Sequence, residues 1–256
     1  MELEGLNIVC LDVETARSAD DCRYCGTTRG SHLPSYELCP TKPDVVHDGD
    51  RAQTFEAIGW HNKAALGLSI GCYYAYRNSR LHFFDRHTLE ETISSFVDVG
   101  CLLVSFNGVS FDFSLMRGLL RQEADALRLS ESDADLFRSG VLVELCDRFK
   151  ALCEVSYDVL AEIWRVDPQG KFERGLNSLD AIAQANGLGV KTMTGAQAPR
   201  LWAEGRYAEV INYCSSDVLK TKALFEMVCH GQPILRGNGQ PLVLPAPPGL
   251  ETLQPL

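Results

Sequence analysis

Hydrophobic residues near the start of the chain fall into three short stretches that predict β-strands. Residues 6–13 form a nearly continuous apolar run that ends in acidic residues, which is typical of a buried strand with a functional tip. Residues 65–76 and 81–84 have the pattern of two further strands, and the turn-type residues 77–79 between them predict a hairpin. We therefore expect the fold to begin with a three-stranded meander.

Helical spacing of apolar residues replaces the strand pattern from residue 89 onwards. Thr88 and Glu91 match a capping box in front of a helix over residues 89–98. A buried strand over residues 101–106 follows, and the next segment is a helix with a single apolar face. That face carries Leu115, Met116, Leu119 and Leu120.

The C-terminal half continues the alternation of strands and helices. Residues 153–157 predict a short strand that leads into a helix from Asp158. Ser178 can cap a helix that Gly187 stops, and residues 207–228 carry the apolar stripe of a long helix. This order of elements predicts an α/β fold with a mixed central sheet flanked by helices, as in an RNase H-like domain.

Two segments fall outside this domain, which we place at residues 1–230. Residues 15–60 are polar, contain Cys and His, and are interpreted as an insertion between the first two strands. Residues 231–256 are rich in Pro and Gly and predict a hairpin followed by a loose tail. The tail could dock a protein partner, although a flexible end is the simpler interpretation.

Composition and charge narrow the possible settings and partners. The chain has 256 residues, 45% of them hydrophobic, with no apolar run long enough for a membrane span and no signal-peptide pattern, so we expect a cytoplasmic protein. Its net charge of -10 argues against a broad basic surface for duplex nucleic acid. We expect most of the ten cysteines to be reduced core residues, among them Cys10, Cys72, Cys101 and Cys229.

Three acidic elements, far apart in the sequence, are candidates for a common site. Asp12 and Glu14 are two residues apart on the first strand, so both carboxylates project to one side. Asp112 opens a helix after a buried strand, and Tyr213 and Asp217 are four apart on the last long helix. Each element alone has a structural alternative: a solvated strand end, a helix cap, or a tyrosine bonded to an exposed aspartate. Their order and context together point to one site.

These motifs resemble those of the DEDD (DnaQ-like) superfamily of 3′ to 5′ exonucleases, and the tyrosine resembles the DEDDy subgroup. The chain is most similar to the predicted exonucleases related to the proofreading domain of family-B DNA polymerases. The likeness covers roughly residues 6–230 and is weakest in the insertion. The matching motifs are Asp12-Val-Glu14-Thr15, Asn107-Gly-Val-Ser-Phe111-Asp112 and Tyr213-x-x-x-Asp217.

The resemblance implies two divalent cations and a hydrolytic mechanism. Clustered carboxylates repel one another unless cations are bound, and oxygen ligands favour Mg²⁺ or Mn²⁺. Two such ions about 3.5 to 4 Å apart stabilise the attacking and leaving oxygens of a phosphoryl displacement. In the family pattern Asp12 bridges both ions, Glu14 and Asp217 complete the water-activating site, and Asp112 acts on the other ion. Tyr213 would orient the attacking water, with proton removal an open alternative.

The resemblance also suggests which residues contact the substrate. Thr15, Asn107 and Phe111 lie beside the predicted ligands and would contact the terminal nucleotide, although Phe111 could equally be a core residue. Lys191 is the first candidate for a local grip on phosphate. Other candidates for this grip, each with a solvated surface charge as the alternative, are Arg200, Arg206, Lys220 and Lys222.

The insertion contains a possible structural zinc site. Cys22 and Cys25 have the spacing of a zinc knuckle, and His32, Cys39 and His47 follow. A bound zinc ion would explain an ordered polar insertion, but the spacing is irregular. A loop with free thiols remains the alternative.

We therefore expect a 3′ to 5′ exonuclease that acts on single-stranded DNA ends and releases nucleoside 5′-monophosphates. An exoribonuclease of the same fold is the nearest alternative, because metal chemistry at phosphorus does not distinguish the sugars. A non-catalytic nucleic-acid-binding accessory of a replication or repair complex is the other. The sequence identifies no protein partner.

Overall fold

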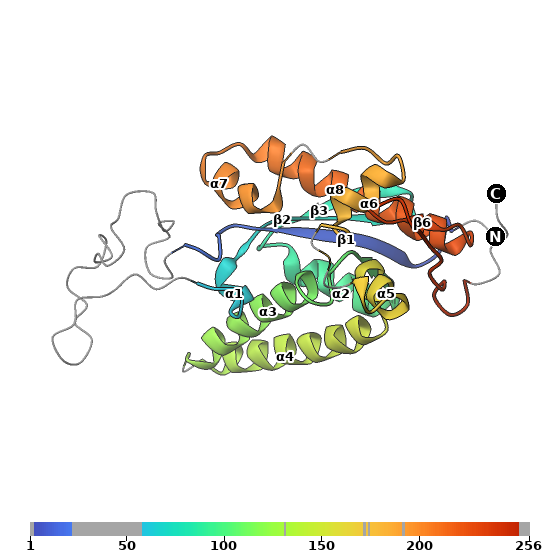
Figure 1. Cartoon of the computed structure of the whole chain (residues 1–256). Helices are drawn as coiled ribbons and strands as arrows, with labels where there is room; N and C mark the ends of the chain where they lie inside the picture. The colour runs from blue at the N-terminus through green and yellow to red at the C-terminus, as the bar shows by residue number, and fades with distance from the viewer. Residues whose placement is uncertain are drawn as a thin grey trace.

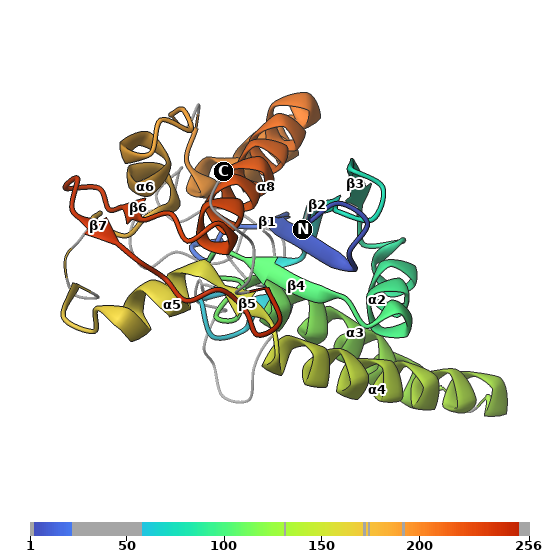
Figure 2. The ribbon, with the colours of Figure 1, turned by 90° about the vertical axis from the view of Figure 1, so that its right-hand side faces the viewer.

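The structure is a computed structural model that describes residues 3–21, 58–130, 132–170, 173, 175–190 and 193–250. Its centre is a five-stranded sheet (Figure 1), and the strand order is β3-β2-β1-β4-β5, with all five strands labelled in Figure 2. The pairs β1–β2 and β2–β3 are antiparallel, whereas β1, β4 and β5 run parallel. The strands are β1 (Ile8–Thr15), β2 (Leu68–Ala75), β3 (Arg80–Phe84), β4 (Leu102–Ser105) and β5 (Tyr157–Asp158).

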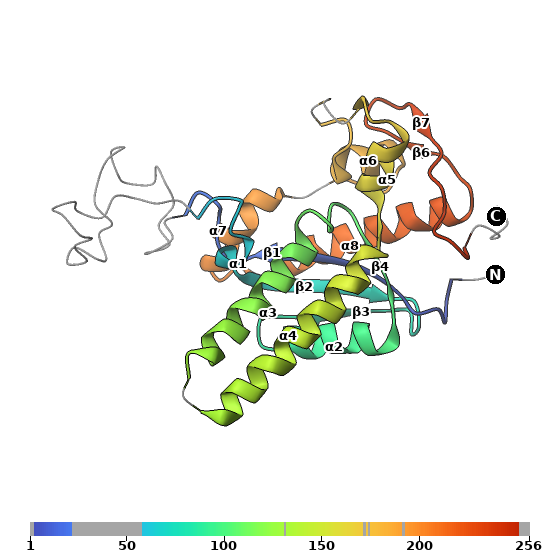
Figure 3. The same cartoon turned by 90° about the horizontal axis from the view of Figure 1, so that it is seen from below.

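Helices cover both faces of this sheet. The long helix α8 crosses one face, and α2, α3 and α4 cover the other, as Figures 1 and 2 show. Figure 3 shows α3 and α4 side by side as an antiparallel pair. The helices are α1 (Lys63–Leu66), α2 (Leu89–Val99), α3 (Asp112–Arg128), α4 (Asp133–Glu154), α5 (Val159–Val166), α6 (Leu179–Ala185), α7 (Ala198–Ala203) and α8 (Tyr207–Cys229), with a 3₁₀ turn, η2 (Gly195–Gln197), before α7. This architecture confirms the predicted α/β fold.

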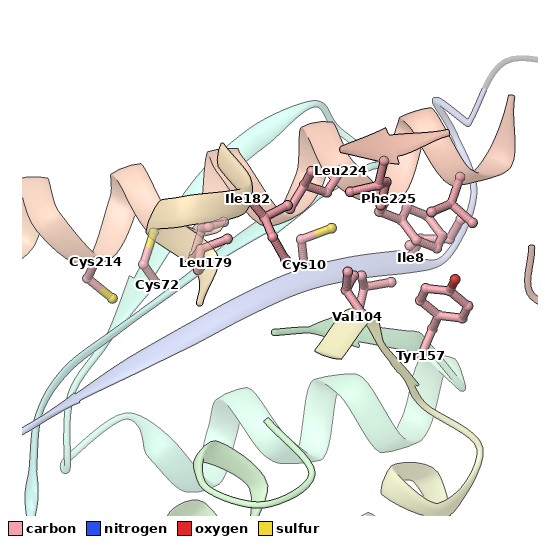
Figure 4. Close-up of a cluster of buried hydrophobic side chains, with 14 of the residues drawn as sticks. Ile8, Cys10, Cys72, Val104, Tyr157, Leu179, Ile182, Cys214, Leu224 and Phe225 are labelled. Atoms are coloured by element: carbon pink, nitrogen blue, oxygen red, sulfur yellow. The ribbon is translucent and has the colours of Figure 1, made fainter. Parts of the chain in front are cut away.

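Strand β1 separates two apolar cores by the alternation of its side chains. Val9, Leu11 and Val13 belong to the core shared with α2, α3 and α4. Ile8 and Cys10 belong to the core beneath α8, as Figure 4 shows. Because side chains alternate along a strand, residues 12 and 14 continue the second series and face the side of α8.

Most of the predicted elements are found, with small shifts at their ends. The hairpin of β2 and β3, the strand β4 and the helices α2, α3 and α8 agree with expectation. Ser178 caps α6, since its Oγ accepts a hydrogen bond from the Ala181 N–H at 3.2 Å. The first strand runs on to Thr15. Its acids therefore lie within the sheet, where the ladder fixes their direction.

Two local predictions were wrong. The capping box is not formed, because the Thr88 Oγ1 accepts the Asp85 N–H at 3.0 Å instead of capping α2. The predicted strand over residues 153–157 is largely absent, because α4 extends to Glu154 and the two-residue strand β5 begins only at Tyr157. Helix α4 has a weak apolar pattern, with Phe137 exposed on its outer side, which explains why the sequence did not predict it.

The C-terminal segment adds a small hairpin and packs against the main core. Its strands β6 (Ile234–Leu235) and β7 (Pro241–Leu242) are antiparallel. Beyond them Leu244 is buried, and the Tyr157 hydroxyl donates a hydrogen bond to the Pro245 carbonyl at 2.9 Å. The segment is therefore packed here rather than loose, and residues 251–256 lie outside the described part of the chain.

The cysteines among the described residues are all free. Cys10, Cys72, Cys101 and Cys229 are free and buried, as predicted for reduced core residues. No helix among the described residues combines the length and apolar character that crossing a bilayer requires.

Gly71 provides a test of the sheet packing. A Cβ at this position in β2 would overlap the ring of Phe84, its buried neighbour in β3, so we expect Gly71→Ala to lower the unfolding free energy by about 1–3 kcal/mol. Gly140 is the matched control, because a Cβ there in α4 meets nothing within 4 Å. We expect Gly140→Ala to stabilise by about 0.5–1 kcal/mol. Urea unfolding of both variants measures these values, and equal effects would contradict the packing argument.

Candidate active site

Two carboxylates from β1 form one wall of the site. Asp12 is half-buried and Glu14 is buried, and both face α8. A carboxylate oxygen of each and the sulfur of Cys214 all lie within 4.8 Å of one another. The strand thus places two acids beside the helix that carries the third predicted motif.

Cys214 is the point at which α8 rests on β1. Its thiol donates a hydrogen bond to the Asp12 backbone carbonyl, with 3.4 Å between sulfur and oxygen. Burial, followed by the nearby carboxylates of Asp12 and Glu14, raises the pKa of the Cys214 thiol well above its ordinary value. Because this thiol is hydrogen-bonded to the backbone and hard divalent cations prefer oxygen to sulfur, the ligand candidates are the carboxylate oxygens.

Tyr213 and Asp217 enter the site from adjacent turns of α8, and both are buried. The two side chains are hydrogen-bonded. Burial and then the charges of Asp217, Glu14 and Asp12 raise the pKa of the Tyr213 phenol above its usual value. The phenol is therefore protonated at neutral pH and acts as a hydrogen-bond donor.

Asp112 reaches the same place from the other side of the sheet. It is the first residue of α3, it is buried, and its carboxylate accepts the Val13 backbone N–H. Burial and then the Asp158 carboxylate raise the pKa of the Asp112 carboxyl to about 7. The bond to Val13 ties this carboxylate to the backbone of the residue between Asp12 and Glu14.

Asp158 holds the loop that delivers Asp112, a role that the sequence did not reveal. Its buried carboxylate accepts the Asn107 N–H at 2.9 Å and the Val109 N–H at 3.0 Å. It also caps α5 through the N–H groups of Leu160 and Ala161 at 3.0 and 3.1 Å. Asn107, with a φ of 72°, takes the left-handed conformation that this turn requires. The prediction that a helix starts at Asp158 anticipated only half of its role.

The acids open into one pocket of about 350 Å³, within the range of small-ligand sites. Predicted residues make up much of its wall, while Trp60, Ser18, Asp20 and residues 195, 196 and 199 were not predicted. Asp217 is outside the lining and is hydrogen-bonded to Tyr213, which is part of it. The predicted residues in the lining are Asp12, Glu14, Thr15, Asn107, Phe111, Asp112 and Tyr213.

Lys220 is the largest departure from the sequence-based interpretation. It is 5% exposed, and its ammonium lies 3.4 Å from the Asp217 Oδ1. Lys220 is therefore a buried ion-pair partner, and both alternatives predicted for it, a phosphate contact and a solvated surface charge, are wrong. The other surface candidates are paired with acids: Lys222 with Glu226, Arg200 with Glu204, and Arg206 with Glu204 and Glu209.

The donor set suits a hard divalent cation. Asp12 and Glu14 of β1 and Asp112 of α3 line one pocket, and Asp217 of α8 is hydrogen-bonded to Tyr213 in the wall of that pocket. Ionised carboxylates are oxygen acceptors of the kind that Mg²⁺ and Mn²⁺ prefer. Several predicted residues lie outside the described part of the chain. These are Cys22, Cys25, His32, Cys39 and His47 of the possible zinc site, and Lys191.

The mixed sheet with helices on both faces defines an RNase H-like exonuclease fold. The chain belongs to the family of predicted 3′-5′ exonucleases related to the exonuclease domain of PolB, whose model matches residues 84–237. The match includes Asp112, Tyr213 and Asp217, while Asp12 and Glu14 precede it. No curated protein and no solved structure matches the chain. Family membership confirms the resemblance and implies a nucleic-acid substrate and divalent metal ions.

We expect Asp158→Ala to lower the free energy of unfolding by about 3 kcal/mol or more, because four backbone N–H groups lose their acceptor. Ser178→Ala is the matched control, since this cap receives one backbone N–H and its loss costs about 1 kcal/mol. Urea unfolding compares the two variants. Hydrogen exchange at the Asn107 and Val109 amides should accelerate only in Asp158→Ala, and unchanged protection would contradict the assigned role.

Lys220→Met should destabilise the protein most when no metal ion is available. The change leaves the buried Asp217 without its ammonium, at a cost of about 3–5 kcal/mol in chelator. Mn²⁺ should reduce this loss, because a cation held by the carboxylates replaces the missing charge. The control is Lys150→Met, which removes an exposed lysine of α4 that pairs with Glu154 and should cost little and equally in both solutions. Urea unfolding in EDTA and in Mn²⁺ measures the free energy of unfolding of both variants. A loss of stability for Lys220→Met that is the same in the two solutions would contradict the argument.

Proposed function

We propose that the protein is a metal-dependent 3′ to 5′ exonuclease of the tyrosine subgroup, acting on single-stranded DNA and releasing nucleoside 5′-monophosphates. The observation that carries the proposal is the meeting of three carboxylates and Tyr213 at one pocket. The pocket volume of about 350 Å³ suits a terminal nucleotide better than an internal stretch of duplex.

Asp12, Glu14, Asp112 and Asp217 would hold two ions, Mg²⁺ or Mn²⁺. Bound there, the ions would acidify water and stabilise the charge that develops on the phosphate oxygens. Asp12 and Glu14 would act as ligands together, since their carboxylate oxygens lie within 4.8 Å of one another and beside Tyr213 of α8. Lys220 neutralises Asp217 when cations are scarce, which reduces repulsion among the acids.

Tyr213 is assigned to positioning the attacking water. Its raised pKa favours a neutral phenol that donates a hydrogen bond over a phenolate that removes a proton. Thr15, Asn107 and Phe111 line the same pocket and would contact the terminal nucleotide. Lys191 remains a predicted phosphate contact.

The net charge of -10 supports an end-directed enzyme. Binding along duplex DNA depends on neutralising many phosphates, which this chain is poorly equipped to do. An exoribonuclease would use the same acids, and the sugar preference depends on contacts to the 2′ position. The presence of all four carboxylates and the tyrosine in this arrangement favours an enzyme over a non-catalytic accessory.

A nuclease assay with end-labelled strands tests the proposal. Wild type should shorten single-stranded DNA from the 3′ end in Mg²⁺ or Mn²⁺ and stop in chelator, and Asp12→Ala should lose about 1,000-fold or more in rate. Asp98→Ala is the control, because it removes an exposed acid of α2 that pairs with Arg148. RNA and duplex substrates run in parallel. Faster cleavage of RNA would favour the exoribonuclease, and no cleavage of any substrate would favour the accessory.

A further inference from the structure

We infer that Trp60 is a stacking residue that, together with Phe111, binds the unpaired base of the terminal nucleotide. The inference rests on the proposed function. In that function, Trp60 would make the enzyme select frayed or single-stranded ends. Trp60 lies at the edge of the insertion, outside all three acidic motifs.

Trp60 combines wide exposure with a place in the pocket wall. Its side chain is 64% exposed, although tryptophan is usually well covered in folded proteins. It lines the same pocket as Asp12, Glu14 and Phe111. The rings of Trp60 and Phe111 are 5.9 Å apart at 62°, so they form an aromatic corner. A flat base stacked on one ring would present its edge to the other.

Backbone hydrogen bonds and a small buried cluster support the two rings of this corner. Backbone hydrogen bonds of 2.9 Å join Ile58 to Asp21 and Gly59 to Ala19, which ties Trp60 to the chain that leaves β1. Ala19, Ile58 and Leu66 form a small buried cluster, and Phe111 packs against it. Trp60 is therefore presented by a packed stem, so its exposure is a feature of the fold.

Lys63 fixes the second ring of the corner. Its ammonium donates a hydrogen bond to the Ser110 carbonyl and lies 6.0 Å from the centre of the Phe111 ring. The cation thus holds the loop that carries Phe111 and contacts that ring within cation–π range. Both rings keep a set position beside the acids.

A nucleic-acid base is the ligand that fits this corner. The nearby carboxylates disfavour a free anion, while a neutral flat base gains stacking energy on an exposed aromatic ring. Stacking tolerates any base identity but requires that the base leave its pair and its neighbours. The corner therefore predicts discrimination between unpaired and paired ends, without a strong preference for one base.

The test combines Trp60→Ala with removal of the terminal base. Binding of a 5′-labelled single strand is measured by fluorescence anisotropy in Mg²⁺, in an Asp12→Asn background that slows hydrolysis. The strand carries either a normal or an abasic 3′-terminal nucleotide. We expect Trp60→Ala to weaken binding of the normal strand about 10-fold and to leave the abasic strand within about 2-fold. Trp60→Phe should lie between wild type and alanine.

Phe137→Ala is the matched control, because Phe137 is 77% exposed on α4 and is not among the pocket residues. It should change neither affinity. Equal weakening of both strands by Trp60→Ala would overturn the inference, as would no effect or no binding by the parent protein. Cleavage by the wild-type protein is measured in a separate assay. The binding result therefore tests the stacking role of Trp60, and the cleavage result tests the proposed exonuclease activity.

Discussion

The site depends on how β1 divides its side chains between two layers. Val9, Leu11 and Val13 turn to the α2–α4 side, so the intervening residues must turn to α8. Asp12 and Glu14 are among these intervening residues, so their side chains point toward α8. Helix α8 can approach them closely because Cys214 is small, and its thiol hydrogen bonds to the Asp12 carbonyl at 3.4 Å. One contact between a strand and a helix thus brings together motifs about two hundred residues apart.

Gathering acids in this way opposes stability, and two of the four carboxylates have compensating interactions of their own. Asp112 receives the Val13 N–H and carries a raised pKa, whereas Asp217 is joined to Tyr213 and Lys220. A buried ammonium partly offsets a buried carboxylate, but it also competes with any cation that binds there. The arrangement therefore suits the proposed metal ions at some cost to the metal-free fold.

Sequence reasoning succeeded where short-range patterns decide the outcome. The apolar run of β1, the hairpin, the capped α6 and the stripe of α8 each follow from local spacing, and so do the directions of Asp12 and Glu14. It failed where long-range packing decides. The burial of Lys220 depends on how α8 is rotated against the sheet, and the two bonds that Asp158 accepts from Asn107 and Val109 join residues about fifty positions apart. Neither arrangement has a local signature.

Trp60 belongs to the second class, and its position has a topological cause. The insertion leaves β1 directly after the acidic strand end and returns through α1 to β2, which pairs with β1. Both ends of the insertion must therefore lie beside the carboxylates, whatever its own sequence is. Because Ala19 and Gly59 are joined by a backbone hydrogen bond, the return point is fixed at the pocket rim. Residues at this stem can change what the pocket accepts while the acids that would bind metal remain untouched, so substrate choice and hydrolysis can vary independently.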